Sequence, residues 1–147
     1  LEWSNHDCPF VVKHYESNNM QKLQNKATDD GTIWLTIISS AKGKQGATTA
    51  EEANQIMKEK GSNPTARILD PSGEIGKLYD AKTTPHMFVI NKEGYIAYMG
   101  AIDSNSSFKQ SSIKGATNYV SEALASLNSG QEIKVSSTNP YGCSVKY

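Results

Sequence analysis

The chain has 147 residues, of which 37% are hydrophobic, and its 15 basic and 15 acidic residues give a net charge of zero. That length fits one domain with a sizeable buried core. A neutral chain lacks the positive surface expected of a protein that binds nucleic acid or anionic membranes, and no apolar run is long enough to cross a bilayer. We therefore expect no nucleic acid partner, no membrane span, and a partner that is a small molecule or another protein.

The two cysteines, Cys8 and Cys143, are too few to indicate a disulfide-stapled secreted scaffold. Leu1 and Trp3 begin a strand-like pattern at the very start, which predicts that the N-terminus is truncated and that a targeting region is missing. We expect a soluble protein whose compartment is left open, with the periplasm and the cytoplasm both compatible with the sequence.

The first part of the chain alternates strand and helix patterns. Residues 1–5 predict a strand, and Pro9 suits the first position of a helix because its φ is already helical. The polar run at 17–19 then predicts that the helix kinks or ends and starts again. Asn18 is expected to cap the second half, and the side chain of Gln21 to bond back to this cap. Residues 32–38 form an apolar, β-branched run typical of a strand buried on both faces, so we expect it to be the central strand.

The middle of the chain continues the alternation. Thr48 and Glu51 have the spacing of a capping box, which predicts the start of a helix that Gly61 ends. Residues 66–69 predict a short strand, and after a turn sequence residues 74–79 predict a short helix.

Two further strands and a last helix complete the pattern. Residues 86–90 and 95–99 predict antiparallel neighbours, because Gly94 can take the positive φ that a tight hairpin needs. The apolar spacing over 112–129 predicts one final helix against the sheet. The remaining residues, 131–147, are polar and are expected to form a tail that carries the second cysteine.

Strands that alternate with helices predict an α/β fold rather than a bundle or a sandwich. The order of elements, with Cys8 at the first strand-to-helix turn and Thr84-Pro85 before a strand, resembles the thioredoxin-like superfamily. Within it, the chain is most similar to the peroxiredoxin-like redoxins, the alkyl hydroperoxide reductase or thiol-specific antioxidant type. The stretches that carry the resemblance are WSNHDCPFV at 3–11, LDPSG at 69–73 and TTPHMFVI at 83–90.

The resemblance implies a thioredoxin-like fold, with a central mixed β-sheet of three parallel strands plus an antiparallel hairpin strand, flanked by helices. It implies a redoxin domain over 1–130, followed by the tail over 131–147. It also implies that Pro85 is a cis-proline whose loop packs against the cysteine, and that Thr84 and Pro85 position the extended backbone of a substrate.

Cys8 is the first candidate for chemistry, and its position supports it without the resemblance. A thiolate at a helix N-terminus faces free backbone N–H groups and the positive end of the helix dipole, which lowers the thiol pKa. His6 and His86 are expected to tune the thiolate, whereas Asp7 opposes it. The alternative is that Cys8 is an inert buried thiol.

At three positions the chain differs from the motifs of dithiol oxidoreductases and peroxiredoxins, and these differences bear on which redox reaction is expected. Val11 stands where a dithiol oxidoreductase has its second cysteine, so Cys8 has no partner one turn along the helix. Asn5 stands where peroxiredoxins have a threonine, and Arg67, the sole arginine, precedes the Pro85 segment instead of following it. We therefore favour thiol and disulfide redox over hydroperoxide reduction.

Cys143 is the remaining candidate partner for Cys8. Closing a long loop costs only logarithmically more than closing a short one, so the separation in sequence is no obstacle. A disulfide needs the two Cα atoms within about 7 Å, which the sequence does not settle. The alternative is a free thiol on a loosely held tail.

The sequence thus predicts a thiol-dependent redox protein in which Cys8 attacks a disulfide or a peroxide, and Cys143 or an external thiol reductant resolves the product. The expected substrate is a disulfide, a thiol or a peroxide, and no cofactor is expected. Two alternatives come from other classes: a copper or zinc module that uses His6, Cys8 and His86, with Cys143 as a further candidate ligand, and a non-catalytic scaffold that only binds partners.

Overall fold

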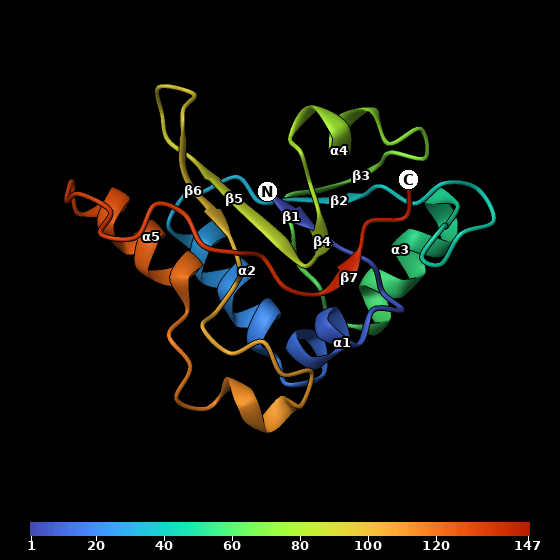
Figure 1. Cartoon of the computed structure of the whole chain (residues 1–147), viewed down its shortest axis with the longest axis horizontal. Helices are drawn as coiled ribbons and strands as arrows, with labels where there is room; N and C mark the ends of the chain where they lie inside the picture. The colour runs from blue at the N-terminus through green and yellow to red at the C-terminus, as the bar shows by residue number, and fades with distance from the viewer.

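The computed structural model describes all 147 residues and has a five-stranded sheet at its centre, with the strand order β3-β2-β1-β5-β6 (Figure 1). The strands are β1 (Glu2–Trp3), β2 (Leu35–Ile38), β3 (Ala66–Leu69), β5 (His86–Ile90) and β6 (Ile96–Gly100). Strands β1, β2 and β3 are parallel, whereas β5 is antiparallel to both β1 and β6. This confirms the predicted mixed sheet of three parallel strands with an antiparallel hairpin.

The shortest strand of this sheet, β1, is its central strand. Trp3 pairs with Ile37 of β2 on one side and with His86 of β5 on the other. The prediction that residues 32–38 form the central strand is therefore wrong, although that run does supply β2. Because β1 has a strand on each side and packed side chains on each face, both of its residues are fully buried.

The carboxylate of Glu2 accepts four hydrogen bonds inside the protein. The donors are the Tyr15 hydroxyl at 2.7 Å, Trp34 Nε1 at 2.9 Å, and Gln24 Nε2 and the Thr36 hydroxyl, both at 3.1 Å. A buried carboxylate is tolerated only when its oxygens are satisfied in this way. Glu2 therefore ties the central strand to α1 (Pro9–Glu16), α2 (Asn19–Asp29) and β2.

A hydrophobic cluster lies on each face of the sheet, because neighbouring residues of a strand point to opposite faces. Helices α1, α2 and α5 (Tyr119–Asn128) contribute to the larger cluster, whose buried members include Cys8, Val11, Tyr15, Met20, Leu23, Met87, Tyr98, Val120 and Ala123. The smaller cluster lies beneath α4 (Glu74–Leu78) and contains Trp3, Ile37, Ala81 and Phe88. The core on the larger side thus includes the candidate nucleophile.

The restart between α1 and α2 occurs where it was predicted, but by another mechanism. Asn18 adopts the left-handed conformation, with φ 59°, and its side chain makes no capping hydrogen bond. Gln21 does not reach back to it either, and its amide donates to the carbonyls of Tyr15 and Lys60 at 2.8 and 2.7 Å. An asparagine tolerates this conformation, so the chain turns through its backbone and not through a side-chain cap.

Helix α3 (Ala50–Glu59) begins one residue later than predicted. Its capping box is made by Thr49 and Glu52. The N–H of Glu52 donates to the Thr49 hydroxyl at 3.2 Å, and the N–H of Thr49 donates to the Glu52 carboxylate at 2.8 Å. The predicted pair, Thr48 and Glu51, has the same residue types at the same spacing, so the sequence pattern alone could not choose between them. The strand β3 and the short helix α4 follow as predicted.

The single final helix predicted over 112–129 is wrong. The chain instead forms a short 3₁₀ helix, η1 (Gln110–Ile113), and then α5. Gly115 lies between them with φ +82°, a left-handed conformation that interrupts a right-handed helix. The side chain of Asn118 then caps α5 by accepting the N–H of Ser121 at 2.9 Å.

The last residues of the chain run back across the molecule to the sheet (Figure 1). β7 (Cys143–Ser144) pairs antiparallel with β4 (Thr83–Thr84) in a separate two-stranded sheet. Bridges from Ser137 to Met99 and from Lys146 to Ser40 flank this pairing. The division into a domain over 1–130 and a tail over 131–147 stays a prediction, while the tail is bound to the rest of the chain on both sides of Cys143.

The helices of the structure are all too short or too polar to cross a membrane.

The cap of α5 gives a test of the revised helix boundary. We expect Asn118→Ala to lower the free energy of unfolding by about 1 kcal/mol, because the N–H of Ser121 loses its acceptor. Asn128→Ala, at the exposed other end of the same helix, should change it by less than about 0.5 kcal/mol. Equal effects of the two substitutions in chemical denaturation would contradict the assigned cap.

Candidate active site

Cys8 is the N-cap residue of α1, directly after the central strand and its turn. Its backbone is extended, with φ −78° and ψ 122°, and Pro9 occupies the first helical turn as predicted. The Cys8 carbonyl accepts the N–H groups of Val11 and Val12 at 2.9 and 2.8 Å. The thiol therefore lies at the positive end of the helix, where negative charge is favoured. The residue is fully buried.

Cys143 lies against Cys8, although 135 positions separate the two residues in the sequence. Both are free thiols, and their Sγ atoms are 2.6 Å apart. The Cys8 thiol also lies 3.0 Å from the carbonyl oxygen of Thr84. The sulfur atoms are therefore within reach of each other for thiol and disulfide exchange, which the sequence had left open.

Backbone pairing holds Cys143 in this position. In the β4 and β7 pair, Cys143 lies opposite Thr84. The peptide bond between Thr84 and Pro85 is cis, and it connects β4 to β5. Gly142 packs so closely on the Thr84 carbonyl that a Cβ atom there would overlap it. Thr84 and Pro85 thus border the segment that carries the second cysteine.

The two thiols differ in acidity. Burial raises the pKa of Cys8, but a hydrogen bond from the Cys143 thiol and backbone N–H groups at Cys143 and Val11 outweigh it, so the net pKa lies below its ordinary value. Burial, the hydrogen bond to Cys8 and the charge of Cys8 raise the pKa of Cys143 to about 11. Cys8 therefore ionises first, and Cys143 remains a thiol that donates to it.

The contacts of the His86 ring are with Lys82 and Phe88, and none is with a sulfur atom. Its Nδ1 accepts the backbone N–H of Lys82 at 3.2 Å, and its ring packs on Phe88 at 4.4 Å between centroids. Burial and the charge of Lys82 lower the pKa of His86 to about 4, so the ring is neutral at neutral pH. It makes no hydrogen bond to Cys8 or Cys143 and carries no positive charge that could stabilise a thiolate.

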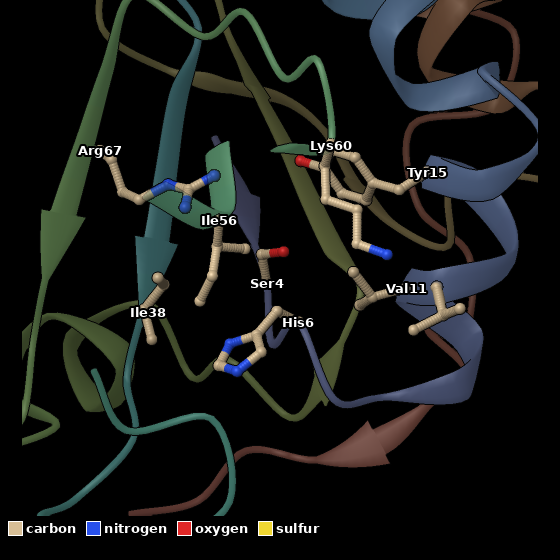
Figure 2. A pocket seen from close by; sticks show the side chains of 9 residues that line it. Ser4, His6, Val11, Tyr15, Ile38, Ile56, Lys60 and Arg67 are labelled. Atoms are coloured by element: carbon tan, nitrogen blue, oxygen red, sulfur yellow. The ribbon is translucent and has the colours of Figure 1, made fainter. Parts of the chain in front are cut away.

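His6 lines a separate pocket together with Ser4, Lys60 and Arg67 (Figure 2). Its Nε2 lies 3.4 Å from a carboxylate oxygen of Asp7. Like His86, it has no hydrogen bond to either sulfur. The thiolate-tuning role predicted for the two histidines therefore stays a prediction without a supporting contact.

The side chains weighed as metal ligands do not converge. No group of three or more histidine, cysteine, aspartate or glutamate side chains in the structure is close enough to hold a metal ion. His6 and His86 lie in different surroundings, and each already has another polar neighbour. The geometry therefore gives the copper or zinc alternative no site.

A buried polar cluster that the sequence analysis did not identify lies under the tail. The Tyr141 hydroxyl donates to Asp103 and lies 3.3 Å from Nε2 of His14, and the Lys13 ammonium is 5.0 Å from the Tyr141 ring centroid. Lys13, His14 and Asp103 are all buried. Consecutive polar residues on a helix usually mark a solvated face, so no local signal indicated that Lys13 and His14 point inward.

Comparison with known proteins agrees with this architecture. The sequence model of the Redoxin family matches residues 3–117, a range that includes Cys8, Thr84 and Pro85 and excludes Cys143. No curated protein matches the sequence.

Two solved structures share the fold. An uncharacterized conserved protein from Geobacillus kaustophilus aligns with a TM-score of 0.79 and 22% identity, covering 99% of this chain and 75% of that one. A hypothetical protein from Sinorhizobium meliloti 1021 aligns with a TM-score of 0.77 and 22% identity, covering 99% of this chain and 77% of that one. The alignment with both structures extends over the tail, beyond the family match.

Replacing Cys143 tests the hydrogen bond that favours the Cys8 thiolate. Serine at position 143 keeps a donor, whereas alanine removes it, so we expect the ultraviolet thiolate absorbance of Cys143→Ala to titrate at higher pH than that of Cys143→Ser. Each variant has a single thiol, and the two should titrate alike once unfolded in denaturant. Identical midpoints in the folded state would contradict the assigned interaction.

The buried histidines predict a loss of stability in acid. The pKa of His86 is about 4 and that of His14 about 3, because both rings are buried, whereas an unfolded histidine titrates near 6.5. Below pH 6.5 these histidines bind protons in the unfolded chain but remain neutral in the folded chain. The free energy of unfolding therefore falls as the pH drops toward 4. Between pH 7 and 5 the loss should be about 2 kcal/mol per histidine. His86→Asn should reduce this slope, and an unchanged slope in denaturation experiments would contradict the assignment.

Proposed function

Because the chain belongs to the Redoxin family, we propose that it is a thiol-dependent oxidoreductase in which Cys8 is the nucleophile and Cys143 is the resolving thiol. The family supports a thiol-based redox function in general, and the division of roles between the two cysteines rests on the site. The observation that carries the proposal is the 2.6 Å approach of the two sulfurs at the N-terminus of α1.

The difference in acidity supports the assignment of roles. The thiolate is the attacking species in disulfide exchange, and of the two sulfurs Cys8 has the lowered pKa. Cys143, whose pKa is raised to about 11, stays protonated in the resting protein and loses its proton only when it attacks. Cys8 therefore acts first, and Cys143 acts on the product.

With a disulfide substrate, the Cys8 thiolate attacks one sulfur, and the other leaves as a thiolate that takes up a proton. Cys143 then attacks the Cys8 sulfur of this mixed disulfide, its proton leaves, and the second substrate thiolate is released. The substrate has gained two electrons, and the chain holds a disulfide between Cys8 and Cys143. An external thiol reductant restores both thiols by the same exchange, so the cycle needs no cofactor.

Two features favour a disulfide over a peroxide as the substrate. The guanidinium of Arg67 lines the pocket of His6 (Figure 2), donates to the carbonyl of Ala53 at 2.8 Å, and makes no hydrogen bond to either sulfur. Asn5 is buried, and its side-chain oxygen accepts the N–H of Asp7. Neither residue offers the sulfurs the positive charge or the hydroxyl expected of a peroxide site. A peroxide that did reach Cys8 would convert it to a sulfenic acid, and Cys143 would condense with this acid to form the disulfide and water.

Mass spectrometry with trapped thiols tests this cycle directly. Treatment with one equivalent of oxidised glutathione should remove two hydrogen masses from the intact chain and join the tryptic peptides of Cys8 and Cys143, and a dithiol reductant should reverse both changes. Oxidation should form this link without loss of the fold, because the sulfurs already face each other.

Two variants separate the roles of the cysteines. Cys143→Ser should accumulate a glutathione adduct on Cys8, because nothing resolves the mixed disulfide, whereas Cys8→Ser should form no stable adduct under the same conditions. An adduct on Cys143 alone would reverse the assignment, and a wild-type chain that remains fully reduced would leave a partner-binding scaffold as the better description.

A further inference from the structure

The edge of β4 is occupied by the chain's own tail in the manner of a bound peptide. β7 adds to β4 as an antiparallel strand, with Cys143 opposite Thr84, and the pairing is separate from the main sheet. Addition of an extended segment to a strand edge is a general mode of peptide recognition, in which backbone bonds supply affinity and side-chain pockets supply specificity. The contacts of the tail therefore show what an extended segment paired with this edge has to satisfy.

The position just before the cysteine accepts only glycine. Gly142 has φ +144°, a backbone conformation that residues with a side chain rarely adopt. A Cβ atom at this position would overlap the carbonyl oxygen of Thr84, which is backbone and cannot rotate away. Both the conformation and the space therefore exclude any larger residue next to the cysteine.

The position two residues before the cysteine is a subsite for an aromatic ring with a hydroxyl. The Tyr141 ring packs on Phe10 at 6.0 Å between centroids, and the buried Lys13 ammonium lies 5.0 Å from it. Its hydroxyl donates to the buried carboxylate of Asp103 and also meets Nε2 of the buried His14 at 3.3 Å. The hydroxyl is the only hydrogen bond partner of His14 Nε2 and the second partner of the Asp103 carboxylate oxygen, which also accepts the Asn105 N–H at 3.0 Å, so a smaller or apolar residue would leave the buried His14 nitrogen unpaired.

From these contacts we infer that the edge of β4 is a peptide subsite selective for a tyrosine–glycine–cysteine segment, whose cysteine exchanges with Cys8, and that the tail is its built-in competitor. This inference rests on the proposed function, since it names the class of disulfide that Cys8 attacks: an extended protein segment with this sequence.

The tail must leave the edge before another segment can bind there. Cys8 is fully buried beneath it. The end of the tail is anchored by Tyr147, whose hydroxyl donates to the carbonyl of Ala81 at 2.8 Å. The Tyr147 ring lies over Gly73 and Gly76, where a Cβ atom would overlap it. Loss of this anchor should favour release of the tail without altering the tyrosine subsite.

The exchange can be followed with peptides whose cysteine forms a mixed disulfide with thionitrobenzoate. The Cys8 thiolate attacks the peptide sulfur, the peptide becomes linked to Cys8, and the coloured thionitrobenzoate anion leaves with the electron pair of the broken bond. The full-length chain carries Cys143→Ser, so that nothing resolves the product, together with Tyr147→Ala to release the tail.

The probe is the octapeptide Asn-Pro-Tyr-Gly-Cys-Ser-Val-Lys, which copies residues 139–146. Two matched peptides carry Ala in place of the glycine or Ser in place of the tyrosine. We expect the unaltered peptide to release thionitrobenzoate at least about tenfold faster than either altered one, because each change removes one of the two selective contacts. All three should react equally with free glutathione, which controls for their intrinsic reactivity.

The outcomes distinguish a failure of the peptide subsite from a failure of the proposed redox function of Cys8. Restoring Tyr147 in the Cys143→Ser chain should slow the unaltered peptide, as expected of a competing tail. Equal rates for the three peptides, or no peptide reaction in a chain whose Cys8 reacts with dithiobis-nitrobenzoate, would overturn the subsite and leave the redox function intact. A Cys8 that fails to react with dithiobis-nitrobenzoate in the Tyr147→Ala chain would instead overturn the proposed function itself.

Discussion

The buried carboxylate of Glu2 is the contact on which the arrangement of this protein depends. It lies on a central strand of only two residues, and it accepts hydrogen bonds from α1, α2 and β2 together with the Trp34 indole. No ion pair to Glu2 lies within bonding distance, so these hydrogen bonds offset most of the cost of removing the charge from water. Because β1 leads through a short turn to Cys8, the same contacts that hold this strand also set where the nucleophile lies.

The second cysteine is placed by a different set of forces. A strand of two residues gives few backbone hydrogen bonds, and β7 depends on the contacts on either side of it. The Thr138 hydroxyl bonds Tyr98 and the Ala101 N–H at 2.7 and 2.9 Å, and Tyr141 bonds Asp103. These contacts bring the two sulfurs together. Their surroundings then lower the pKa of Cys8 and raise that of Cys143. Two adjacent thiols with unequal pKa values, one buried and one half-buried, have a built-in order of reaction.

Local patterns predicted the elements better than their boundaries. The hairpin of β5 and β6 was predicted correctly because Gly94 does adopt a positive φ, and that requirement is local. The capping box of α3 was displaced by one residue because two threonine and glutamate pairs share the same spacing. The final helix was predicted as too long because the apolar periodicity continues through Gly115, and the break depends on a backbone conformation that periodicity does not report.

The sequence by itself determined the α/β order of elements, the family resemblance, and the location of Cys8 at a helix start, because each depends on residues close together in the chain. Only the tertiary structure decided that Cys143 meets Cys8, that His86 is neutral and turned to Lys82, that His6 lies in another pocket, and that Lys13 and His14 are buried. These facts depend on contacts across long sequence separations. A residue's type and spacing do not encode such contacts, since burial and charge partners are set by the packing of the whole chain.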